Sequence, residues 1–453
     1  MSAIIRNGPR LEDLSAKRFD DQSLQRLRHL TWKNPRQAAA QIVCILMRRD
    51  RARFRWIYTL LFAAMLTAPA QLFTQDVTSA RLRNAAHLLT AGNLKGAESE
   101  LQPVLRVTPD EYRALDLLGV IRILQGREND AQDLFHRVVA IKPDFASGHA
   151  HLGLLYVQMD RPGEAVPQLR EAVRLDPART DASVALVHIW RQQAEAATTA
   201  GDFATALALL TDARKLAPKN ADVQLEFGTA ALRMFLWQDA IEAFQQTLRR
   251  RKNDPVAIWG LGRAFTGLSK FEDARQQFAR YVAMRPDDSS GHCALGMTLA
   301  ALERSREART QFEHSIKLAP AQTESYFRLG LLDLDSKDLD SAATNFRHAL
   351  EHDPKHAGAM AGLGRIEFEQ KRYNEALELL QKAIANDDSL RVAHYYLGLT
   401  YSRMDRKAES EQELEKATQL EHQEVEKRFT ILDPGSASAP DAEPQKLHPN
   451  IRR

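Results

Sequence analysis

Residues 295–330 read LGMTLAALERSREARTQFEHSIKLAPAQTESYFRLG and contain one full period of this chain. Leu-Gly opens the stretch and returns at its end, so that Gly296 and Gly330 are 34 residues apart. Between them Ala308 is followed four residues later by Phe312, and Pro320 closes the period. A fixed period of this length indicates a repeat array. The same step links six glycines in succession: Gly228, Gly262, Gly296, Gly330, Gly364 and Gly398.

A small residue recurs at the position of Ala308 in ten successive units, which extends the repeat beyond the six glycines. Apolar residues within each unit recur at spacings of three, four and seven, which predicts two amphipathic helices. Turn signals such as Gly201-Asp202 separate the two helices. Small residues let two backbones approach closely, and the Leu or Phe four residues after each of them fills the remaining space. The sequence therefore predicts an all-α fold. The ten small residues are Ala97, Ala131, Ala165, Ala206, Ala240, Ala274, Ala308, Ala342, Ala376 and Ser410.

This pattern resembles the tetratricopeptide repeat, with Leu-Gly near the start of each unit, Ala-x-x-x-Phe in the middle and Pro at the end. The resemblance covers residues 78–422. It implies a right-handed superhelical solenoid of about ten helix-turn-helix units, and in that family partners bind the concave surface formed by the first helices. Some positions depart from the pattern: Lys252, Asp388 and His422 replace the closing proline, and Ala194 replaces the glycine of the fourth unit.

The spacing of the closing prolines predicts one irregular unit. Pro177 and Pro218 are 41 residues apart instead of 34. At 3.6 residues per turn, the difference amounts to about two additional helical turns. We expect them near residues 181–199, in the first helix of the fourth unit.

The predicted organisation is one continuous array, because a solenoid grows by adding units that contact only their neighbours. A final helix over residues 409–429 is rich in Glu, Gln and Lys, as a terminal cap requires. Residues 423–453 are predicted to be a disordered tail, since their proline-rich composition carries little apolar surface. The two cysteines, Cys44 and Cys293, exclude a disulfide framework.

The charge distribution argues against nucleic-acid binding. The net charge is +3, but residues 1–70 contribute +8 (13 Lys/Arg against 5 Asp/Glu), which leaves −5 for the remainder. Phosphate neutralisation requires a basic surface that such a body lacks. The run Arg249-Arg250-Arg251-Lys252 is the exception. Two interpretations stay open for it: cations that favour a helix C-terminus, or a docking site for an acidic ligand.

Residues 47–70 have the three parts of a secretory signal peptide. A basic segment from Met47 to Arg55 precedes the apolar run Trp56–Leu66, and Ala68-Pro69-Ala70 supplies small residues for cleavage between Ala70 and Gln71. Residues 1–46 are then an upstream extension from a misassigned start. The alternative is an uncleaved membrane anchor over residues 56–73, which approach the ~20 residues that cross a bilayer. Either interpretation places the repeats outside the cytoplasm, in the periplasm or secreted.

One string resembles a catalytic motif. His348, Glu351 and His352 match the His-x-x-Glu-His pattern of a zinc hydrolase. They fall inside the second helix of the eighth unit, where the register predicts that both histidines point to solvent and that no pocket closes over a metal. We therefore predict no metal, no cofactor and no enzymatic activity, and His348 and His352 remain weak metal candidates.

The resemblance also suggests where a partner binds. With the repeat glycine as position eight, positions five and nine of each first helix project onto the inner surface. Aromatic residues beside arginines are typical of a binding hot spot, although Trp259 and Phe327 have an alternative role in filling the seam between units. The candidates are Arg191, Leu225, Trp259, Arg263, Met297, Phe327, Arg365, Phe368 and Tyr395.

The sequence thus predicts a non-enzymatic scaffold that binds a protein or peptide partner on its concave surface, outside the cytoplasm and without nucleic acid. A membrane association follows only if the signal segment is uncleaved. One alternative is a scaffold in envelope polysaccharide synthesis or export. Another, from a different class, is the zinc hydrolase built on the His-x-x-Glu-His string.

Overall fold

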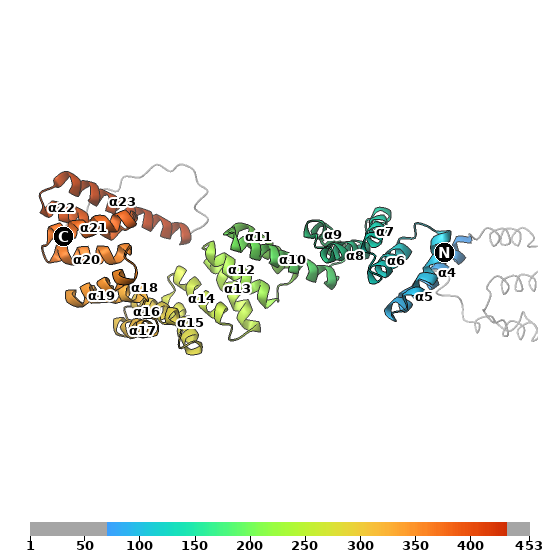
Figure 1. Cartoon of the computed structure of the whole chain (residues 1–453), viewed down its shortest axis with the longest axis horizontal. Helices are drawn as coiled ribbons and strands as arrows, with labels where there is room; N and C mark the ends of the chain where they lie inside the picture. Colours follow the sequence, from blue (N-terminus) through green and yellow to red (C-terminus); the bar gives the residue numbers. More distant parts are fainter. Residues whose placement is uncertain (1–69, 433–453) are drawn as a thin grey trace, which may run out of the picture. The chain divides into compact units, whose positions relative to one another are not determined.

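The structure is a computed structural model that describes residues 70–432. Within this range the chain forms twenty helices, α4 to α23, and no strand (Figure 1). Consecutive helices pack against each other as ten pairs. Each pair consists of a first helix and a second helix that are joined by a short turn. The predicted all-α repeat fold of ten helix pairs is confirmed.

The described chain divides into two compact units, one up to Pro143 and one from Asp144 onward. How they join as one array stays a prediction. The first unit contains two pairs: α4 (Ala70–Thr90), α5 (Leu94–Val107), α6 (Tyr112–Leu124) and α7 (Glu128–Ile141). The second contains eight: α8 (Ala146–Gln158), α9 (Pro162–Leu175), α10 (Thr180–Thr199), α11 (Phe203–Leu216), α12 (Ala221–Arg233), α13 (Trp237–Arg250), α14 (Pro255–Gly267), α15 (Phe271–Met284), α16 (Ser289–Ala301), α17 (Ser305–Leu318), α18 (Thr323–Asp335), α19 (Leu339–His352), α20 (Ala357–Glu369), α21 (Tyr373–Asn386), α22 (Arg391–Arg403) and α23 (Lys407–Leu432).

Helix lengths repeat as closely as the sequence does, with one exception. The first helices from α6 to α22 have 13 residues apart from α10, which has 20. The difference of seven residues is about two turns. The predicted irregularity is therefore confirmed, and α10 absorbs all of it by lengthening, without a bulge or a long loop.

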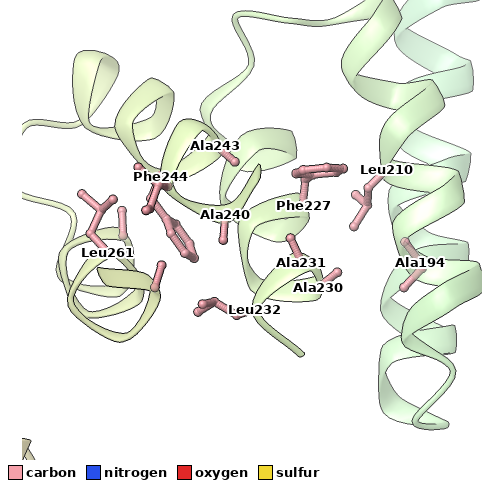
Figure 2. Close-up of a cluster of buried hydrophobic side chains, with 14 residues drawn as sticks. Ala194, Leu210, Phe227, Ala230, Ala231, Leu232, Ala240, Ala243, Phe244 and Leu261 are labelled. Atoms are coloured by element: carbon pink, nitrogen blue, oxygen red, sulfur yellow. The ribbon is translucent and has the colours of Figure 1, made fainter. Parts of the chain in front are cut away.

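Phenylalanines on the second helices wedge between successive first helices. Phe244 of α13 is only 1% exposed and belongs to a cluster with Ala240 and Leu261 (Figure 2). Gly228 of α12 and Gly260 of α14 lie against opposite sides of its ring, since a Cβ atom on either glycine would overlap it. The ring therefore joins one helix pair to the next. First helices also contact one another directly, at α8 and α10, α12 and α14, α16 and α18, α18 and α20, and α20 and α22.

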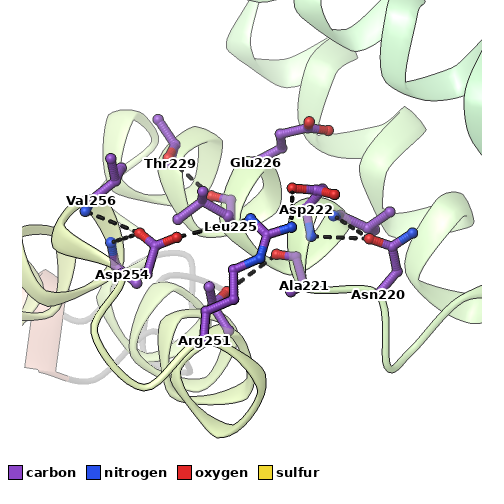
Figure 3. Close-up of polar contacts among 12 residues, drawn as sticks. Asn220, Ala221, Asp222, Leu225, Glu226, Thr229, Arg251, Asp254 and Val256 are labelled. Carbon is purple, nitrogen blue, oxygen red and sulfur yellow. Dashed lines mark hydrogen bonds and ion pairs between the residues drawn. The ribbon is translucent and has the colours of Figure 1, made fainter.

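The basic run at the end of α13 contains one structural arginine. Arg251 donates to Asp222 at the start of α12 (2.7 Å) and lies 3.9 Å from Asp254, which caps α14 (Figure 3). Asp254 accepts from the backbone N–H groups of Val256 and Ala257 at 3.0 Å. Arg251 thus links three helices at one junction, and this residue needs no acidic ligand to explain it.

The two ends of the described chain can be compared with the predicted C-terminal tail and the predicted signal cleavage site. The terminal helix α23 continues to Leu432, beyond residue 422, which corrects the expected start of the disordered tail at 423. Gln, Glu and Lys, all strong helix formers, extend the helix there. The predicted cleavage site, Ala70 and Gln71, lies at the first turn of α4, while residues 1–69 and 433–453 are outside the described range. No helix within residues 70–432 has the length and apolar character needed to cross a membrane.

Candidate functional site

A groove of about 530 Å³ opens in the second unit beside α14 and α16. Four aromatic side chains line it, Trp237, Trp259, Phe271 and Phe278, together with Met297. We call this the aromatic groove. Trp259 and Met297 occupy the inner positions that the repeat register predicted, and Arg263 lines the same groove. The structure therefore brings three of the predicted binding residues together.

Trp259 both lines the groove and packs against the neighbouring second helix. Its ring lies 5.2 Å from that of Phe278, edge to face, and 5.0 Å from that of Tyr281, both on α15. Such contacts fix the indole in one orientation. The two roles considered for Trp259 are thus compatible, because one edge of a half-buried ring packs while the other lines the groove.

Trp237 and Phe271 were missed by the sequence reasoning, which considered only first helices. Each is the first residue of a second helix, α13 and α15. Trp237 reaches the groove because Gly267, at the end of α14, has no Cβ: one placed there would lie 2.5 Å from the indole. The available signal was the recurrence of an aromatic at this position, since Phe203 and Tyr373 also begin second helices.

The groove carries positive charge. Arg263 and Arg328 line it, and no Asp or Glu does. Arg328 is neutralised by Glu324, whose Oε1 accepts from Nε at 2.6 Å. Arg263 is exposed, and among the described side chains it has no hydrogen bond or ion pair. An unpaired guanidinium beside apolar walls favours a ligand that carries a carboxylate.

A second groove of about 580 Å³ follows the lengthened helix α10. Two further predicted residues, Arg191 and Leu225, line it. Here the arginine is already paired: its Nε donates to Glu226 at 2.9 Å, and this hydrogen bond raises the pKa of Arg191 above its ordinary value. The lining as a whole holds two arginines, Arg191 and Arg233, and two acids, Glu195 and Glu226, so this groove offers an acidic partner less electrostatic attraction than the aromatic groove.

The remaining predicted residues lie elsewhere in the second unit. Phe327 packs between Phe346 (6.0 Å between ring centroids) and His356 (4.7 Å), which favours the seam-filling role considered for it. Three others surround a residue that the sequence reasoning did not select, Tyr396. The guanidinium of Arg365 lies 5.5 Å from the Tyr396 ring, Phe368 lies 5.8 Å from it, and Tyr395 lies 5.3 Å from it.

The two candidate metal histidines do not simply face solvent. The rings of His348 and His352 lie 5.2 Å and 5.9 Å from the ring of Tyr326 on α18, while 43% of the His348 side chain stays exposed and His352 is exposed. The Nδ1 atom of His348 is 3.0 Å from Glu351. The second helix packs this face on the preceding first helix, which the sequence pattern did not reveal. Among the described side chains, no group of three His, Cys, Asp or Glu residues is placed to hold a metal ion.

Comparison with protein families gives matches over much of the second unit. Models described as tetratricopeptide repeat match residues 146–179, 225–289, 289–322, 333–394 and 393–423. These ranges include α13 to α16, which contribute all the residues that line the aromatic groove except Arg328.

Several solved structures resemble part of this chain. A tetratricopeptide repeat protein from Parabacteroides merdae is 14% identical, with 54% of this chain and 98% of that chain covered and a TM-score of 0.47. MamA from Desulfovibrio magneticus is 19% identical, covering 37% and 96%, with a TM-score of 0.36. YrrB, described as having an unusual peptide-binding site, is 22% identical, covering 41% and 95%, with a TM-score of 0.33. Likeness at this level carries no information about a ligand.

Proposed function

The chain is a tetratricopeptide repeat protein, and from this premise we propose that it is a non-enzymatic scaffold that holds a segment of a partner protein in the aromatic groove. The observation that carries the proposal is that aromatic side chains held in place by packing lie beside Arg263, which has no ion-pair partner among the described side chains. Buried aromatics and arginines provide most of the binding energy in protein interfaces. Rings already held by α15 lose little conformational entropy when a partner binds.

The lining of the groove is also better suited to binding a peptide than to catalysing a reaction. Its walls are apolar, and the two cations beside them serve orientation and charge pairing. No acid or histidine lines it, so a general base is absent from its walls. A partner segment with an apolar side chain next to a carboxylate would satisfy both features: the side chain enters the groove and the carboxylate pairs with Arg263.

We further propose that the scaffold works outside the cytoplasm. The support is the order of segments in residues 47–70: a basic stretch, an apolar run and small residues before Gln71. We expect the mature chain to begin at Gln71 and to be found in the soluble envelope or secreted fraction. Expression from Met1 with a C-terminal tag, fractionation, and mass spectrometry of the N-terminus test this. Recovery of an intact residue 56–73 segment in the membrane fraction would indicate the anchored form instead.

Reversing the charge of Arg263 should weaken partner binding without affecting the fold. The probe is a set of peptides selected on the full chain from a random phage-displayed library, then synthesised with a fluorescent label. For Arg263→Glu we expect about tenfold weaker binding, or about 1.4 kcal/mol, and an unchanged unfolding midpoint. Fluorescence anisotropy measures the first and urea titration the second. The attraction between exposed charges should also fall as salt is raised.

The matched control is Arg347→Glu on α19, which reverses an equally exposed arginine with no hydrogen bond or ion pair among the described residues. Its peptide affinity should equal that of the parent chain. Trp259→Ala should weaken binding by more than ~1 kcal/mol if the indole is an anchor. Unchanged affinity in both Arg263→Glu and Trp259→Ala, with a lower melting temperature in the latter, would assign Trp259 to packing alone and refute the proposal.

A further inference from the structure

The turn between α12 and α13 differs from the nine other turns within helix pairs of residues 70–432. In every one of them a single residue with positive φ, between 55° and 80°, ends the first helix. Glycine or a polar residue normally occupies this left-handed position because the conformation is unfavourable for a large side chain. Phe235, at φ 58°, is the one apolar residue among the ten. The other nine are Gly92, Gly126, Asp160, Gly201, Ser269, Glu303, Lys337, Lys371 and Asp405.

The backbone hydrogen bonds of this turn do not depend on its apolar side chains. The N–H of Phe235 donates to Leu232 O at 3.3 Å and that of Leu236 to Ala231 O at 2.9 Å, the same pattern that closes the other turns. Yet Phe235 is 68% exposed, and Leu236 and Met234 are 40% and 39% exposed. We call these three residues the apolar turn. Its sequence is unfavourable in two ways: Phe235 adopts a left-handed backbone conformation, and all three apolar side chains are exposed to water.

The apolar turn is continuous with the aromatic groove. The ring of Phe235 meets that of Trp237 edge to face, with 5.4 Å between centroids. Trp237 in turn lines the groove and lies on Gly267 at its edge. Phe235 and Trp237 therefore form one apolar surface that leads from the groove out onto the turn.

We propose that the apolar turn is a second anchor point for the partner segment that occupies the aromatic groove, an inference that rests on the proposed function. The occupant is a peptide segment of a partner protein with two apolar side chains and an acidic residue. One apolar side chain enters the groove, the carboxylate pairs with Arg263, and the second apolar side chain covers Phe235 and Leu236. Charge complementarity selects this occupant, because Arg263 has no carboxylate partner among the described side chains and no acid lines the groove. Binding then removes exposed apolar surface that the free chain leaves in water.

The test replaces both side chains of the turn with residues that suit its backbone. In the variant Phe235→Asn with Leu236→Ser, asparagine tolerates the left-handed conformation and serine restores the polarity seen in the other turns. We expect at least tenfold weaker binding of the library-selected fluorescent peptides to the full chain. Its unfolding midpoint in urea should equal or exceed that of the parent, so that loss of binding is not loss of fold. The matched control is Glu303→Asn with Arg304→Ser, the equivalent positions two turns later, which should leave affinity unchanged.

The outcomes separate this inference from the proposed function. If Arg263→Glu and Trp259→Ala weaken peptide binding while the turn variant does not, the inference is overturned and the groove remains the site. If none of the three variants changes affinity, the proposed function itself fails. Sedimentation of the parent as a dimer that the turn variant converts to a monomer would identify a second copy of this chain as the occupant. A gain in peptide affinity on deleting residues 433–453 would identify the chain's own tail. Either of the last two results overturns the inference.

Discussion

Replacing Phe244 with alanine should lower the free energy of unfolding of the second unit by about 3 to 5 kcal/mol, the usual range for a fully buried phenylalanine. Its ring is 1% exposed and fills the space between Gly228 and Gly260, which have no side chains with which to fill the cavity that alanine would leave. Urea denaturation followed by circular dichroism measures the loss. Since repeat units are stabilised by their neighbours, amide exchange should accelerate most in α12, α13 and α14.

Phe235→Ala is the matched control for this substitution. It makes the same chemical change nine residues away, at a side chain that is 68% exposed. We expect its effect on stability to remain within about 0.5 kcal/mol. A loss below about 1.5 kcal/mol for Phe244→Ala would mean that α12 and α14 close onto the cavity, and that the glycines do not hold the two helices apart around a ring.

Stability should fall at alkaline pH because Tyr281 must lose a proton from a buried position. Burial, followed by the hydrogen bond that its hydroxyl donates to Asp288 Oδ2 at 2.6 Å, raises the pKa of Tyr281 to about 12. In the unfolded chain a tyrosine titrates near ~10. The folded state therefore retains this proton to higher pH than the unfolded state. The stabilisation that comes from the raised pKa of Tyr281 is fully present below about pH 10. It is lost between about pH 10 and 12, and the loss reaches about 2 kcal/mol at pH 11.5.

Tyr281→Phe isolates this effect from other titrating groups. At pH 8 the variant should be less stable than the parent by about 1 kcal/mol, because the hydrogen bond to Asp288 is lost. As the pH rises toward 11.5, the parent should lose its advantage and become the less stable of the two. Urea midpoints measured for both chains across this range give the difference directly. A difference that stays constant with pH would show that the Tyr281 hydroxyl titrates as it does in water.

Part of the candidate site was predictable because helical geometry repeats with the sequence. Trp259 and Arg263 are four residues apart and therefore lie on one face of α14. Met297 is 34 residues beyond Arg263 and so occupies the same position in the next first helix. The helical turn and the 34-residue repeat were therefore sufficient to predict that these side chains share a surface. Whether that surface binds a partner stays a prediction.

Other features of the site depend on neighbours that are distant in sequence. Trp237 lines the aromatic groove because Gly267, thirty residues later, leaves space for its indole. Arg191 and Arg263 both occupy positions that the register predicts to face inward, five and nine respectively, yet only Arg191 has a carboxylate, Glu226, within reach. Phe327 was selected as a binding residue with an alternative role in the seam, and its ring packs on Phe346 and His356. None of these differences can be read from the repeat pattern of one unit.

The sequence alone predicts the helix pairs, their number and the additional turns of α10, because periodicity, small residues and turn signals act over a few residues within each unit. It also predicts which face of each first helix carries the candidate residues. Which of those side chains have partners within the protein, and which have none among the described residues, depends on tertiary contacts. Phe235 illustrates the distinction: its turn follows from the register, but its exposure beside Trp237 follows from how the neighbouring helices pack. Burial and pairing are set by contacts between units, and such contacts are absent from any local pattern.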